Sequence, residues 1–133
     1  PDGSEIAFTD SGCLMTVKRE GGPVRRILCS SAAPPRSLQG ILRSALGVLA
    51  WSPSGDKIAW TVYHPDRTAV DVWIVDRETG AHHVAWTGES ELASWPSELE
   101  WSPKGDSIAF TKRFQRRWEI WKLRNFLPLS GRS

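Results

Sequence analysis

The residues of this chain that could take part in acid–base, nucleophilic or metal chemistry are not spaced in a catalytic pattern. The only histidines are His64, His82 and His83. Adjacent side chains on a strand point to opposite faces, so His82 and His83 cannot easily share one metal ion. The chain contains no Gly-x-Ser-x-Gly nucleophile elbow, and no spacing suggests a Ser–His–Asp set. We therefore expect no enzymatic activity, no catalytic residue, no cofactor and no metal site.

Acidic residues cluster in one short stretch of the chain. Four glutamates gather there: Glu89, Glu91, Glu98 and Glu100. Paired carboxylates serve glycosidases and calcium sites, but metal ligation here would need the loop to curl around the ion. We interpret the stretch as a solvated acidic loop.

Two segments are candidates for contact with a partner. The first is a basic cluster opposed only by Glu119; it comprises Lys112, Arg113, Arg116, Arg117, Lys122 and Arg124. Such a cluster suits an acidic partner or a phosphate backbone, but we favour an edge hairpin whose charges discourage aggregation. The second is the insert His64–Val70, which either carries contacts or reflects drift in loop length. The candidate partner-binding residues are Arg113, Arg116, Arg117, Trp118, His64, Asp66 and Arg67.

Composition narrows the class of protein. Of the 133 residues, 40% are hydrophobic and 24% charged, which is typical of a globular chain. The net charge of +2 implies no general attraction to nucleic acid, and no apolar run approaches the length of a membrane span. We expect a protein partner, no nucleic acid and no membrane insertion.

The two cysteines flank an expected hairpin. A two-residue turn at Gly21–Gly22 would place Leu14 opposite Cys29, whereas a shift of one residue would place Cys13 opposite Cys29. The second register allows a disulfide in an oxidising compartment. We favour two half-buried thiols, because little in the sequence fixes the register.

One phrase occurs three times and dominates the sequence. It reads PDGSEIAF at residues 1–8, WSPSGDKIAW at residues 51–60 and WSPKGDSIAF at residues 101–110. Proline and glycine favour a turn, and the apolar residues after them favour a strand. A turn–strand unit that recurs about every 50 residues indicates an array of small sheets.

Each repeat reads as up to four short antiparallel strands, the pattern of a propeller blade. Runs such as Val72–Val75 are apolar at consecutive positions, which suits a strand buried on both faces. A short helix is allowed only in the linker, over Ser37–Ala50. The expected strands are 6–9, 14–18 and 24–28, then 48–51, 58–62, 72–76 and 82–86, then 99–101, 108–111 and 119–123.

Tryptophans recur in step with the repeat. Trp51 and Trp101 share one repeat position, and Trp73 and Trp121 share another. The simplest role for such residues is packing between blades. Trp86, Trp95 and Trp118 fall outside the repeat positions, so they are the candidates for a glycan-binding surface.

The phrase Trp-Ser-Pro-x-Gly-x-x-Ile-Ala-Phe/Trp, followed by an apolar strand with Trp, resembles the TolB-type repeat, a WD40-like (PD40) β-propeller repeat. The resemblance implies an all-β fold that closes into about six blades, and a periplasmic or extracytoplasmic location. The family's aspartate after the proline is present as Asp2 but is replaced by Ser54 and Lys104. These replacements argue against a metal bound by that turn.

We therefore predict one partial β-propeller domain over residues 1–133, with about three four-stranded antiparallel blades, the first and last incomplete. Blade 1 covers about 1–30, a linker 31–47, blade 2 about 48–88 and blade 3 about 97–127. The predicted function is a non-catalytic scaffold for protein–protein interaction. The alternatives are the access-filtering propeller of a prolyl-oligopeptidase-type serine peptidase and a glycan-binding propeller. Three incomplete blades cannot close a ring, so we expect a longer chain or self-association through open blade edges.

Overall fold

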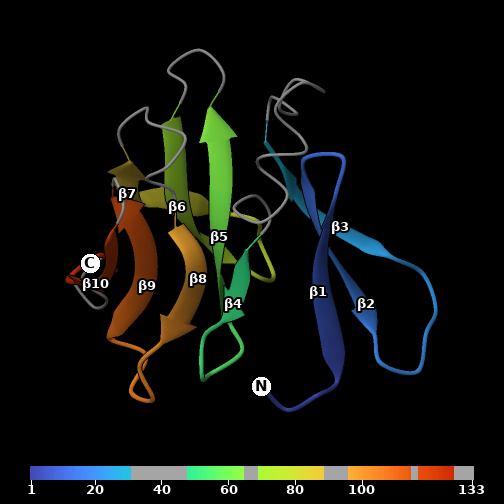
Figure 1. Cartoon of the computed structure of the whole chain (residues 1–133). Helices are drawn as coiled ribbons and strands as arrows, with labels where there is room; N and C mark the ends of the chain where they lie inside the picture. Colours follow the sequence, from blue (N-terminus) through green and yellow to red (C-terminus); the bar gives the residue numbers. More distant parts are fainter. Residues whose placement is uncertain (31–47, 65–68, 89–95, 115–116, 128–133) are drawn as a thin grey trace, which may run out of the picture.

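A computed structural model describes residues 1–30, 48–64, 69–88, 96–114 and 117–127 and shows three antiparallel sheets standing side by side (Figure 1). We name these sheets blades 1, 2 and 3. Blade 1 contains β1 (Glu5–Asp10), β2 (Cys13–Lys18) and β3 (Arg25–Cys29). Blade 2 contains β4 (Leu49–Trp51), β5 (Lys57–His64), β6 (Ala69–Asp76) and β7 (His82–Gly88). Blade 3 contains β8 (Pro96–Trp101), β9 (Ser107–Phe114) and β10 (Arg117–Arg124).

The predicted fold class is confirmed. The described residues are all-β, the outer blades have three strands each, and the middle blade has four. Within each blade, strands that follow one another in the sequence pair antiparallel, and the three sheets do not close on themselves. No helix among the described residues has the length and apolarity needed to cross a bilayer. Most of the helix allowed over Ser37–Ala50 lies outside the described residues, and its last two residues belong to β4.

The repeated phrase builds the same turn in blades 2 and 3. In blade 2 the Ser52 hydroxyl accepts a hydrogen bond from the backbone N–H of Lys57 (3.0 Å) and donates to Asp56 (3.0 Å). Ser102 makes the equivalent contacts with Ser107 (3.2 Å) and Asp106 (2.7 Å). The turns need left-handed backbone at Gly55 and Gly105, which glycine adopts without steric cost. In blades 2 and 3 the serine before the proline therefore fixes the turn that leads into the second strand.

Blade 2 is buried on both faces. On one face Ile58, Trp60, Trp73 and Val75 form a cluster with Leu14 of blade 1. On the other face Ala59, Val72 and Ile74 pack with blade 3, and that cluster contains Leu99, Trp101, Ile108 and Phe110. Successive strand residues point to opposite faces, so apolar residues at consecutive positions serve both clusters.

Trp101 ties blade 3 to blade 2 directly. Its indole N–H donates to the backbone carbonyl of Ala50 in β4 (3.0 Å), and its ring packs edge-on against Phe126. Only 8% of Trp101 is exposed. Trp51, at the same repeat position, packs against the cluster between blades 1 and 2. Both tryptophans therefore lie between blades, as their repeat position predicts.

The two cysteines form a disulfide, so the preference for free thiols is wrong. Cys13 pairs with Cys29 and Leu14 with Leu28, and a bulge then shifts the ladder between Leu14 and Met15. The connection from β2 to β3 is also longer than a two-residue Gly21–Gly22 turn, because β2 ends at Lys18 and β3 begins at Arg25. The longer turn and the bulge together bring the two cysteines into the same cross-strand pair.

Candidate functional site

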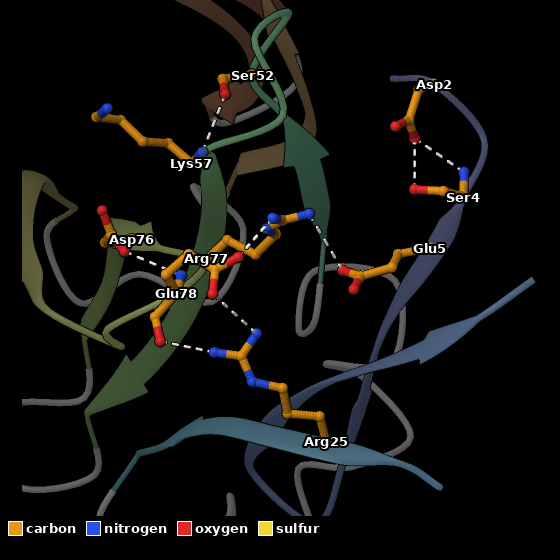
Figure 2. A network of polar contacts seen from close by, with 9 residues as sticks. All are labelled: Asp2, Ser4, Glu5, Arg25, Ser52, Lys57, Asp76, Arg77 and Glu78. Atoms are coloured by element: carbon orange, nitrogen blue, oxygen red, sulfur yellow. Dashed lines mark hydrogen bonds and ion pairs between the residues drawn. The ribbon is translucent and has the colours of Figure 1, made fainter. Parts of the chain in front are cut away.

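A polar cleft lies between the turn that precedes β1 of blade 1 and the turn between β4 and β5 of blade 2. It has a volume of about 480 Å³. Figure 2 shows the polar contacts around it, with Asp2, Ser4 and Glu5 on one side and residues of blade 2 on the other. The cleft is lined by Pro1, Asp2, Ser4, Glu5, Trp51, Pro53, Ser54, Gly55, Asp56 and Arg77.

Ion pairs join the two blades beside this cleft. The guanidinium of Arg77, just after β6, lies 3.6 Å from the Glu5 carboxylate at the start of β1 (Figure 2). Arg25 of β3 donates a hydrogen bond to the backbone carbonyl of Glu78 (2.6 Å) and lies 3.8 Å from its carboxylate. These partly exposed pairs contribute little energy individually, and they add to the apolar cluster that already joins blades 1 and 2.

Two carboxylates of the cleft, those of Asp2 and Asp56, are held in their ionised form. The Lys57 ammonium and the Ser54 and Ser52 hydroxyls hold the pKa of Asp56 well below its ordinary value. The Ser4 hydroxyl and backbone N–H likewise lower the pKa of Asp2. A carboxyl group with a depressed pKa is a poor proton donor at neutral pH, because catalysis favours a pKa near the working pH.

The cleft does not provide a catalytic set of the kinds considered above. Its lining includes serines and carboxylates, but no histidine is among its lining residues. Within the described residues, no group of three or more His, Cys, Asp or Glu side chains could hold a metal ion. We assign the contacts around this cleft to the joint between blades 1 and 2.

The structure splits the basic cluster predicted near the C-terminus. The Lys112 ammonium lies between blades 2 and 3, 5.5 Å from the ring centre of Trp86 and 5.2 Å from that of Trp121. Lys122 and Arg124 of β10 are exposed, as are Arg117 and Trp118. Among the described residues, only part of the predicted basic cluster is therefore exposed, and Arg117 lies on the opposite face of β10 from Lys122 and Arg124.

The other predicted partner-binding residues are less fully described. His64 and Arg113 lie near the ends of β5 and β9, where only the backbone is described. Asp66, Arg67 and Arg116 lie outside the described residues. The insert is shorter than expected, because β5 continues to His64 and β6 begins at Ala69. The structure therefore does not bring the two candidate segments together into one described site.

Of the three tryptophans outside the repeat positions, one offers a free surface in the described part of the chain. Trp86 packs against Phe110, with ring centres 5.0 Å apart, and belongs to the joint between blades 2 and 3. Trp95 lies outside the described residues. Trp118 is 66% exposed and has an exposed aliphatic neighbour on the same strand, Ile120, which is 82% exposed. Ile120 was not among the residues predicted from the sequence.

Solved structures with this arrangement of blades are β-propellers. TolB from Acinetobacter baumannii matches with a TM-score of 0.65 and 21% identity over 91% of this chain. A putative TolB from Agrobacterium tumefaciens matches with a TM-score of 0.64 and 18% identity over 93% of the chain. The chain resembles TolB-type β-propellers in its fold. A third match is the β-propeller domain of the Trilobed protease from Pyrococcus furiosus, with a TM-score of 0.60 and 14% identity over 93% of the chain.

These likenesses concern the fold alone, because all three identities are low. The chain spans 28% and 40% of the two TolB structures and 36% of the protease propeller. No family model and no curated protein sequence matches it. The TolB-type resemblance predicted from the repeated phrase is confirmed at the level of the fold.

Proposed function

We propose that this chain is a non-catalytic binding module of the TolB-like propeller type, which contacts a protein partner through the β10 side of blade 3. The observation that carries this proposal is the exposure of Trp118 (66%) and Ile120 (82%) on the same face of β10 as the exposed Lys122 and Arg124. Tryptophan and arginine are enriched at protein interfaces. A large exposed apolar pair rimmed by charges is typical of an interaction site.

The rigid blades explain how such a surface would act. β10 pairs with β9 along its whole length, from Arg117 opposite Phe114 to Arg124 opposite Ser107. β9 is in turn anchored by Ile108 and Phe110, which are at most 2% exposed. The exposed side chains of β10 are therefore presented in a fixed geometry, which lowers the entropic cost of binding.

Affinity purification tests the proposal. Proteins that the wild-type chain retains and the variant Trp118→Ala/Arg124→Glu loses would be identified by mass spectrometry and purified. Each would then be titrated calorimetrically against both chains. We expect the double variant to weaken binding at least tenfold, as for truncation of an aromatic anchor. The matched control is Val84→Ala/Arg26→Glu, which changes an exposed valine and an exposed arginine on blades 2 and 1. Equal binding by wild type and the Trp118 variant would refute the proposal.

The alternative assigns the chain to a peptidase. The match to the propeller of the Trilobed protease favours an access-filtering propeller of a prolyl-oligopeptidase-type enzyme. That reading requires an α/β-hydrolase domain in the same reading frame, which sequencing of the flanking gene would reveal.

The disulfide supports an extracytoplasmic location for the module. Disulfides form and persist in oxidising compartments and are rare in the cytosol. In cells lysed in acid, the Cys13–Cys29 thiols should become available to an alkylating reagent only after reduction. Alkylation without reduction would contradict this location.

A further inference from the structure

The face of blade 3 that points away from blade 2, its outward face, does not carry the apolar residues by which the other blades pack together. Blade 2 supplies the reference, because Val48, Ala50, Ala59, Val72 and Ile74 of its corresponding face pack against blade 3. The two blades have the same register: Ala59 lies between Ala50 and Ile74, and Ala109 lies between Glu100 and Lys122. Equivalent positions of the two blades can therefore be compared one by one.

Three of these positions carry a charge in blade 3. Glu98 replaces Val48, Glu100 replaces Ala50, and Lys122 replaces Ile74. Since Ile108 and Phe110 are buried against blade 2, the alternate residues Ala109 and Thr111 point outward with these three. Glu98, Glu100, Ile120 and Lys122 are all exposed.

The charges on this face are sorted by strand. Both glutamates lie on β8, the small residues Ala109 and Thr111 lie on β9, and Lys122 and Arg124 lie on β10. Trp118 and Ile120 add apolar area on the basic side. Burying this face under an apolar blade would leave several charges unpaired, which is strongly unfavourable.

Resting on the proposed function, the geometry points to a second copy of this chain as the partner of this face. In the proposed dimer, the outward faces of the two blade 3 sheets face each other across a twofold axis. The axis runs parallel to the strands and passes above β9, so β8 of one copy lies over β10 of the other. Glu100 then faces Lys122 twice across one interface, because both residues pair with Ala109. Charge complementarity between Glu100 and Lys122 favours this orientation, since an axis perpendicular to the strands would place glutamates over glutamates.

The outer face of blade 1, at the other end of the row of blades, is apolar rather than charged. The outward residues of blade 1 are Ile6, Phe8, Met15 and Val17, which pair across β1 and β2. They occupy the positions at which blade 2 presents Ile58, Trp60, Trp73 and Val75 to blade 1. A head-to-tail ring would press the charges of blade 3 onto this apolar face. The face-to-face pairing of two blade 3 sheets lowers that cost, because Glu100 and Lys122 gain partners of opposite charge.

Charge exchange tests the pairing in the whole chain. Sedimentation velocity in the micromolar range should show a dimer for the wild type. Glu100→Lys and Lys122→Glu should each weaken dimerisation roughly tenfold or more, because each places two like-charged pairs in the interface. An equimolar mixture of the two single variants should form a heterodimer, since both pairs then have opposite charge. The double variant E100K/K122E should dimerise as the wild type does.

Each result bears on a different claim. A monomeric wild type, or single variants that stay apart when mixed while retaining the wild-type circular dichroism spectrum, would overturn the inference. Phe8→Asp, on the far face of blade 1, should leave the dimer intact; loss of the dimer in this variant would place the contact there and also overturn it. Trp118-dependent capture of a foreign protein by a monomeric chain would leave the proposed function standing.

Discussion

Replacing Trp101 by phenylalanine tests how much the contact between blades 2 and 3 contributes to stability. Trp101 is 8% exposed, and its indole N–H donates to the carbonyl of Ala50 across the joint between blades 2 and 3 (3.0 Å). Phenylalanine cannot make this hydrogen bond, which contributes about 0.5–1.5 kcal/mol net. It also removes roughly 40 Å² of buried ring, or about 1 kcal/mol at about 25 cal/mol per Å². We therefore expect a loss of about 2 kcal/mol in the free energy of unfolding.

Differential scanning calorimetry provides the assay. At about 2.1 cal/mol/K per residue, 133 residues give an unfolding entropy near 0.28 kcal/mol/K, so Trp101→Phe should lower Tm by about 7 °C. Trp51→Phe is the matched control, because Trp51 is less buried and, within the described residues, makes no indole hydrogen bond. Its effect should be about half as large. Equal shifts for the two variants would refute the role given to the Trp101–Ala50 contact.

Two further predictions follow from the turns. Gly80 has φ +73°, and an added Cβ would lie 2.8 Å from the Ile27 carbonyl oxygen of blade 1, so Gly80→Ala should cost at least about 2 kcal/mol in urea unfolding. Gly3→Ala, at φ +76° with open space around it, should cost only about 1 kcal/mol, and equal costs would exclude the close contact. The Lys57 ammonium holds the pKa of Asp56 in the folded state below the ordinary value of 3.8, so the folded state binds fewer protons than the unfolded chain in acid. The ionised Asp56 therefore stabilises the fold above about pH 5, and this stabilisation is lost on acidification. The free energy of unfolding, measured with urea between about pH 6 and pH 2, should fall less steeply on acidification for Asp56→Asn than for the wild type. Parallel curves of this free energy against pH would contradict the linkage.

The sequence predicted the strands and the repeat well because both depend on local chemistry. The Ser-Pro-x-Gly turn needs a hydroxyl acceptor and a positive φ, and both requirements are visible in the residues at 52–55 and 102–105. Apolar residues at consecutive positions on β6 likewise predicted burial on both faces. These features could be inferred without knowing which strands pair.

The candidate site depended on register, which the sequence does not determine. The bulge after Leu14 brings Cys13 opposite Cys29, and no residue type in that hairpin predicts it. The basic cluster looked continuous along the chain, yet strand alternation turns Lys112 toward blade 2 and Lys122 outward. Comparing positions 48, 50 and 74 with 98, 100 and 122 could have revealed the charged face from the repeat alone, once the strand pairing was assumed.

The Cys13–Cys29 bond lies at the end of β3, an edge strand of blade 1. An edge strand is the element that can most easily peel away and pair with a neighbouring molecule. Here the Ser30 N–H also donates to the Gly12 carbonyl (2.8 Å), just beyond the covalent link. Exchange of β3 with a neighbouring molecule would therefore require reduction of the disulfide as well as loss of the β2–β3 hydrogen bonds. We expect the oxidised molecule to keep β3 paired with its own β2.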